Sequence, residues 1–190
     1  MEASAAAMSS AKSFHYDMDL RMTMTAQGMS LEVPLTLAGD FQAPDRSQAT
    51  LSVTIAFFSI ESQVITVGER TYITDPETGE WQLIEGDAAF LAGPGDILGT
   101  APSQIKDLVG VGRESLEGVP VYHIKGVAPS SAFGQAGGDF AIDFWIGVDD
   151  SLVRQIVAEG NLQASQEVLP LLGGVALGEG RVSLTVKLSE

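Results

Sequence analysis

Hydrophobic and polar residues alternate without a break from Ser13 to Gln27. Every second residue from Phe14 to Met24 is large and apolar, and each residue between them is polar. This period of two predicts one long β-strand, about 40 Å at about 3.3 Å per residue, with a dry face and a wet face. We therefore expect a long antiparallel sheet whose dry face is covered either by protein alone or by a bound apolar ligand.

The same alternation recurs along the chain and predicts about ten strands. They are expected within the segments 13–27, 31–41, 49–57, 60–67, 70–74, 80–84, 111–117, 121–127, 140–146, 152–162 and 182–188. Pro34 has no N–H to donate, so its half of the second strand is expected to be a sheet edge or to carry a bulge. The sequence has no internal repeat or linker, and its 190 residues are expected to form a single domain, 1–190.

Three segments interrupt the alternation. The Ala-rich start predicts one short helix. Residues 86–109 and 163–180 are apolar and broken by glycine and proline, and short helices are expected at 88–92 and 102–109. We expect these segments to lie over the dry face. The predicted fold class is therefore α+β, mostly antiparallel β, with one sheet and short helices on its apolar side.

Composition and charge exclude several classes of function. Hydrophobic residues make up 45% of the chain and charged residues 18%, which is typical of a globular protein. The net charge of −15 argues against binding to nucleic acid or to anionic lipid surfaces. The chain has no cysteine, so disulfides, thiolate catalysis and zinc–thiolate sites are excluded. It also has no run of about 20 apolar residues and no signal-peptide pattern.

Two groups of side chains are candidate metal sites, and neither has suitable spacing. His15, Asp17 and Asp19 share one face of the first strand, where same-face neighbours stand about 6.6–7 Å apart and cannot converge on one ion. The acidic loop at 75–80 lacks the spacing of a calcium motif, and its residues are those of a turn. We therefore expect no metal and no cofactor.

Catalytic motifs are equally weak. His123 falls in a predicted strand, and the sequence has neither a G-x-S-x-G turn nor an H-E-x-x-H motif, so a structural histidine is the better interpretation. The segment GVGRES at 110–115 lacks the third glycine and the βαβ context of a phosphate loop. Paired carboxylates of a hydrolase are an open alternative in so acidic a chain, but no pair is favoured. We expect no enzymatic activity.

Several motifs of the second half occur together in one known family. Residues 109–126 contain Glu-x-x-x-Gly-x-x-x-Tyr-His, from Glu114 to His123, and residues 139–160 contain an aromatic strand with Trp145. Two acidic turn residues and the Leu-Val-Arg of 152–154 follow. In order and spacing these motifs resemble the LppX/LprG-type bacterial lipoproteins and, more distantly, the LolA/LolB lipoprotein carriers. The start AMSSAKSFHY and the turn DPETGEW are also similar, so the resemblance covers essentially the full chain.

This resemblance implies a strongly curved half-barrel sheet with helices on its concave side and an apolar cavity between them. The implied ligands are acylated lipids or the acyl chains of lipoproteins, and a monomer is expected. The resemblance further implies export to the cell envelope or cell surface and a lipid anchor on an N-terminal cysteine. The chain contains neither that cysteine nor a signal peptide, so anchoring would depend on residues of a longer precursor.

The candidate cavity wall is formed by the apolar residues of the strands and interrupting segments. It comprises Met18, Leu20, Met22, Leu35, Leu37, Val53, Ile55, Phe90, Leu91, Leu98, Ile105, Leu108, Phe140, Ile142 and Phe144. The alternation alone is equally compatible with an ordinary packed core. The alternative function is therefore a cell-surface interaction module with a filled core and no ligand cavity.

Overall fold

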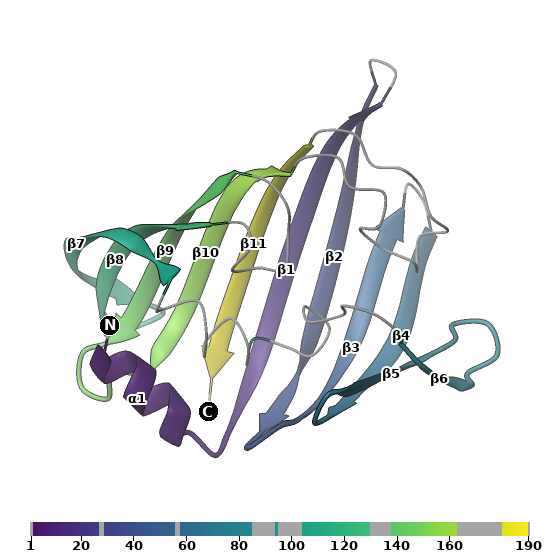
Figure 1. Cartoon of the computed structure of the whole chain (residues 1–190), viewed down its shortest axis with the longest axis horizontal. Coiled ribbons are helices and arrows are strands. Elements are labelled where there is room, and N and C mark those ends of the chain that lie inside the picture. Colours follow the sequence, from purple (N-terminus) through teal and green to yellow (C-terminus); the bar gives the residue numbers. More distant parts are fainter. Residues whose placement is uncertain are drawn as a thin grey trace.

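The computed structural model describes residues 2–26, 29–55, 58–84, 94, 104–129, 138–162 and 180–189, with the side chains at 24–26, 29, 31, 55 and 162 excepted. Within these residues, one helix and eleven strands are present, and the strands form one open, curved, antiparallel sheet (Figure 1). The elements are α1 (Glu2–Ser10), β1 (Ser13–Ala26), β2 (Met29–Gln42), β3 (Arg46–Ile55), β4 (Phe58–Val67), β5 (Arg70–Thr74), β6 (Trp81–Leu83), β7 (Lys106–Leu116), β8 (Val119–Pro129), β9 (Asp139–Gly147), β10 (Val153–Leu162) and β11 (Gly180–Ser189).

The long first strand stands in the middle of the sheet, as Figure 1 shows. The strand order is β6-β5-β4-β3-β2-β1-β11-β10-β9-β8-β7. Strand β1 pairs with β2 on one side and with β11, the last strand of the sequence, on the other. Among the described strands, the two halves of the sheet pair with each other where β1 meets β11, so the centre of the sheet needs both of these strands.

The register brings the apolar positions of neighbouring strands onto one face. Directly opposite residues of antiparallel strands point to the same side of a sheet, and Met18 stands opposite Leu37 on β2 and Val186 on β11. We call this side the apolar face, and the side that carries Asp17 and Asp19 the polar face. Met8 of α1 packs against the buried cluster on the apolar face, so the helix lies on that side.

The structure confirms the predicted fold class and the curved half-barrel sheet, with one difference in detail. The eleven strands correspond to the eleven segments in which strands are expected, but a single helix, rather than several, is found in the described residues. Strand β1 has nearly the predicted bounds because its alternation is uninterrupted. The ladder between β2 and β3 begins at Leu35, one residue after Pro34, so the preceding part of β2 is paired on one side only within the described residues.

The helix expected at 102–109 is wrong from Lys106 onward. Strand β7 begins at Lys106 and pairs with β8, with register shifts between Lys106 and Val109 and between Gly110 and Gly112. Two glycines and the β-branched Val109 and Val111 disfavour a helix here, and the neighbouring strand supplies hydrogen bonds that a local pattern cannot reveal. The helix expected at 88–92 and the interrupting segment at 163–179 lie outside the described residues.

A tight turn fixes the register of the outermost hairpin. Strands β7 and β8 are joined by Glu117 and Gly118, whose φ angles are 52° and 89°. Two consecutive positive φ angles are the signature of a type I′ turn, whose twist matches that of the flanking strands. This turn places Glu114 of β7 next to the residues of β8 and β9 described below.

Candidate functional site

The apolar face is a continuous surface of buried hydrophobic side chains that crosses the sheet. It includes aromatic residues at one side of the sheet, aliphatic residues at its centre and two methionines on β1. Its buried members include Met18, Met22, Val33, Leu35, Leu37, Leu51, Val53, Phe140, Ile142, Phe144, Ile156, Val182, Leu184 and Val186. Many of these residues stand directly opposite one another on neighbouring strands, so the surface is contiguous from β3 to β9.

Most of the candidate wall residues lie together on this surface. Eight of them are buried strand residues of the apolar face: Met18, Met22, Leu35, Leu37, Val53, Phe140, Ile142 and Phe144. Leu20 is partly buried and packs against the same cluster, and Ile105, just before β7, is buried within it. Ile55 belongs to β3, but its side chain lies outside the described residues, as do Phe90, Leu91 and Leu98. Burial of this kind is equally expected for a packed core.

Leu108 does not lie where the predicted helix would have placed it. It is on β7, an edge strand, and its exposed fraction is 44%. A methyl group of Leu108 lies 3.1 Å from the position that a Cβ on Gly126 would occupy, so its side chain covers the backbone of β8. Leu108 is therefore a residue of the sheet edge and not part of a helix over the apolar face.

The apolar face is uncharged, because no charged side chain is among its buried residues. All ten lysines and arginines lie in the described part of the chain, and none of them is buried. The described aspartates and glutamates are likewise at least partly exposed. Unpaired charges are expensive to bury, whereas an uncharged apolar surface can accept an apolar molecule without that cost.

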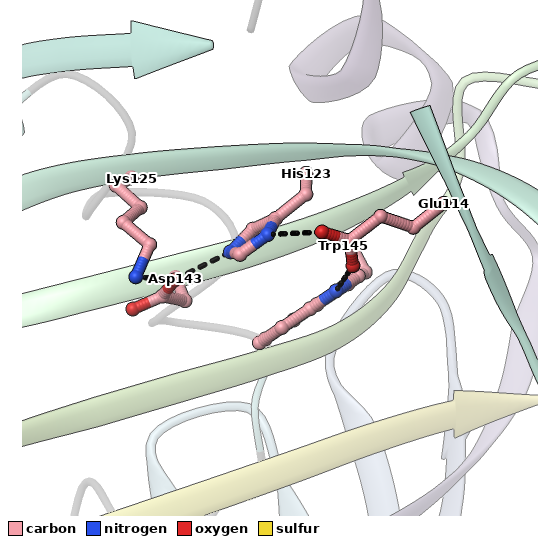
Figure 2. Close-up of polar contacts among 5 residues, drawn as sticks. All are labelled: Glu114, His123, Lys125, Asp143 and Trp145. Atoms are coloured by element: carbon pink, nitrogen blue, oxygen red, sulfur yellow. Dashed lines mark hydrogen bonds and ion pairs between the residues drawn. The ribbon is translucent and has the colours of Figure 1, made fainter. Parts of the chain in front are cut away.

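A second cluster of chemically competent residues lies on the polar face and is shown in Figure 2. The ring of His123 on β8 bonds through Nδ1 to Glu114 Oε1 of β7 at 2.9 Å and through Nε2 to Asp143 Oδ1 of β9 at 2.5 Å. The indole N–H of Trp145 donates to Glu114 Oε2 at 3.1 Å, and the Trp145 ring stacks on His123 with centroids 4.5 Å apart. Lys125 pairs with Asp143 at 3.2 Å.

This cluster connects β7, β8 and β9 at one end of the sheet. Its hydrogen bonds also leave His123 without a free nitrogen to act as a base. Both imidazole nitrogens are engaged by carboxylates, so neither is available to take a proton from a substrate. The expectation of a structural histidine therefore agrees with the observed bonds. Within the described residues, no group of three or more potential ligands is arranged to hold a metal ion.

Burial and hydrogen bonding act in opposite directions on the His123 ring. Burial disfavours the charged ring and lowers its pKa, but the hydrogen bonds to Asp143 and Glu114 together outweigh burial and raise the pKa above the ordinary 6.5. The bond from His123, supported by the bond from Trp145, lowers the pKa of Glu114. The two carboxylates therefore favour the imidazolium form of the ring.

We expect the substitution His123→Gln to lower the free energy of unfolding by about 2 kcal/mol at pH 6 and by less in alkaline solution. A raised pKa means that the stabilisation by His123 is complete below pH 6.5 and is lost as pH rises through the folded-state value. Denaturant unfolding of both proteins between pH 5.5 and 9 measures the difference. The matched substitution is His15→Gln, at a more exposed histidine that also bonds an aspartate, Asp40. A pH-independent difference for His123→Gln would contradict this assignment.

In the described residues, no helix is both long and apolar enough to span a membrane. The architecture defines a class of protein in which one open, curved, antiparallel sheet holds an uncharged apolar face on one side. The sequence identifies the family within this class: the chain belongs to the LppX_LprAFG lipoprotein family, whose model matches residues 1–172. Among curated protein sequences, none is significantly similar to this chain.

Two solved structures of this family are similar in fold. The lipoprotein LppX of Mycobacterium tuberculosis aligns with a TM-score of 0.59 and 16% identity, covering 99% of this chain and 90% of its own. LprF of Mycobacterium bovis aligns with a TM-score of 0.55 and 14% identity, covering 100% of this chain and 89% of its own. At such identities the similarity extends to the fold alone, and it spans nearly the whole of both proteins.

Proposed function

We propose that this protein is a non-catalytic carrier that binds the acyl chains of lipids or lipoproteins on its apolar face. The observation that carries the proposal is the uncharged character of that face over the six adjacent strands from β3 to β9. Membership of a lipoprotein family supports the same conclusion. The candidate wall residues, from Met18 to Phe144, would replace water around the acyl chains, and no chemical step is required.

Apolar burial alone supplies enough free energy for such binding. Each buried methylene contributes about 0.8 kcal/mol, so a chain of about 16 carbons gains on the order of 12 kcal/mol before the costs of association and ordering. Met18 and Met22 are unbranched and polarizable, which suits a surface that adapts to chains of different shape. Affinity should therefore depend on chain length and hardly on salt concentration.

The cellular setting belongs to the same proposal. A carrier of acyl chains acts between membranes or at their surface, and the family to which the chain belongs is one of lipoproteins. We propose that the protein works as a monomer in the cell envelope after export, and that a lipid anchor in its precursor holds it at a membrane. Organic extraction of the purified protein, followed by analysis of the extract for acyl lipids, tests the carrier function.

One observation favours a second candidate, a module that binds another protein. On the polar face of β4–β6, Val67, Trp81 and Leu83 are each 49% exposed. Leu83 stands directly opposite Tyr72, which in turn stands opposite Ile65, so these strands present apolar side chains to solvent. A protein that used only this surface would have a filled apolar face and would extract without lipid.

A further inference from the structure

The polar face of the sheet carries an exposed apolar patch on β4, β5 and β6, at the end of the sheet remote from β7 (Figure 1). Its central row is set by register, since Ile65 stands opposite Tyr72, and Tyr72 stands opposite Leu83. Val67 and Trp81 lie on the same face in the two neighbouring rows. Ile65 is 36% exposed, and Val67, Trp81 and Leu83 are each 49% exposed. We call these residues the β4–β6 patch.

The fold does not require apolar side chains in the β4–β6 patch. The same strands already pack through their other side, where Val64 and Ile73 are buried. Polar residues suit this face equally well, and they occupy the positions around the patch: Gln48, Thr50, Gln63 and Thr74. A contiguous apolar surface with polar positions around it is typical of a region that contacts another molecule.

Two arginines flank the β4–β6 patch at one side. Arg46 on β3 and Arg70 on β5 stand on either side of Val67 in a single row, and both are exposed. Asp45 and Glu69 precede them in the adjoining turns, but among the described residues neither arginine forms an ion pair with a carboxylate. In a chain whose net charge is −15, this patch therefore combines apolar groups with available positive charge.

This combination fits an acidic protein partner better than a membrane. Tryptophan, tyrosine and arginine are enriched where proteins contact each other, and guanidinium groups pair well with carboxylates. An extended anionic bilayer would also approach the acidic surface around the patch and be repelled by it. A partner protein needs to match the patch only locally, because charges more than about 8 Å away are largely screened by physiological salt.

We propose that the β4–β6 patch, together with Arg46 and Arg70, is a docking surface for a protein that presents acidic residues beside apolar ones. The surface extends about 14 Å across four strands and about 14 Å along them, at about 4.8 Å between strands and about 6.8 Å between same-face neighbours. That is well below the roughly 800 Å² that each partner buries in a stable complex, so the contact is transient. This inference goes beyond the carrier function and does not depend on it, because the patch lies on the side of the sheet opposite the apolar face.

The test compares three fluorescein-labelled peptides that share the same leucine and tyrosine residues, interspersed with glutamate, glutamine or lysine. Fluorescence anisotropy at physiological salt gives the affinity of the protein for each peptide. The net charge of −15 would by itself favour the lysine peptide, so a preference for the glutamate peptide requires a local surface of opposite character. We expect the glutamate peptide to bind at least about fivefold more tightly than the lysine peptide.

Substitutions then assign the binding to the patch. We expect Arg70→Ser and Leu83→Ser each to weaken binding of the glutamate peptide at least about threefold. The matched controls are Arg181→Ser on β11 and Val109→Ser on β7, which remove an exposed arginine and an exposed valine elsewhere on the sheet. They should leave the affinity unchanged. If one patch variant does not fold, the other decides, since the two substitutions lie on different strands.

Three results would overturn the docking surface. The first is a glutamate peptide that binds no more tightly than the lysine peptide, and the second is unchanged affinity in both patch variants. The third is a loss of peptide binding in Leu20→Asp, which would place the peptide on the apolar face. Phosphatidylglycerol vesicles and polygalacturonate are titrated in parallel. If either binds and the peptide does not, and Arg70→Ser abolishes that binding, the surface belongs to a membrane or a polysaccharide and not to a protein.

Discussion

Replacing Gly39 by alanine should lower the free energy of unfolding by about 3 kcal/mol. Gly39 lies in β2, between Tyr16 on β1 and Ala49 on β3. A Cβ added to Gly39 would lie only 2.6 Å from Cα and Cβ of Ala49 and would collide with the backbone oxygen of Gln48. Backbone atoms cannot rotate away as a flexible side chain can, so β2 and β3 would have to separate at a buried point. Denaturant unfolding monitored by circular dichroism measures the effect.

The matched control is Gly110→Ala, in edge strand β7. A Cβ at Gly110 would meet no atom within 4 Å, and its backbone needs no left-handed conformation. We expect its stability to change by less than about 0.5 kcal/mol or to rise slightly, because alanine restricts the unfolded chain. Equal losses at Gly39 and Gly110 would show that β2 and β3 do not approach as closely as described.

Replacing Leu20 by aspartate should weaken the binding of an uncharged acyl probe at least about tenfold. Leu20 lies on the apolar face, opposite Leu35 on β2 and Leu184 on β11, and is only partly buried. A carboxylate there can stay hydrated in the unliganded protein, so the fold should survive. Binding an acyl chain against it would remove that hydration. Probe titration at pH 7 measures the loss of affinity.

Thr23→Asp provides the control for this substitution because it adds the same charge to the same strand. Thr23 is exposed on the polar face, where it stands opposite Glu32 on one side and Arg181 on the other. We expect its affinity for the probe to match that of the unchanged protein. Equal losses in both variants would mean that net charge, rather than the apolar face, determines uptake.

The fold could be predicted where local chemistry repeats. Strand β1 alternates over its whole length, and β5 is bounded by turn residues on both sides, so the sequence predicts both at nearly their observed bounds. The segment from Lys106 to Val109 could not be assigned from its own residues, because its strand conformation depends on pairing with β8. The second half of β4 was equally ambiguous, because Val64 lies on the apolar face whereas Ile65 and Val67 lie on the polar face.

The apolar face could be predicted from the local sequence pattern, whereas the contacts of the polar cluster depend on how the strands pair. The apolar face follows from alternation alone, and most of its predicted residues are buried together. The bond between His123 and Asp143 joins residues that are far apart in sequence, and only the pairing of β8 with β9 brings them together.

Native mass spectrometry of the purified protein tests the carrier function most directly. The protein contains 190 residues with a mass of 20.0 kDa, so one bound lipid is a resolvable addition to its mass. The account predicts a discrete added mass that is released by organic solvent and identified as an acyl lipid. A bare mass, together with no uptake of a fluorescent fatty-acyl probe, would contradict it and would favour a filled sheet that binds a protein through its exposed surface.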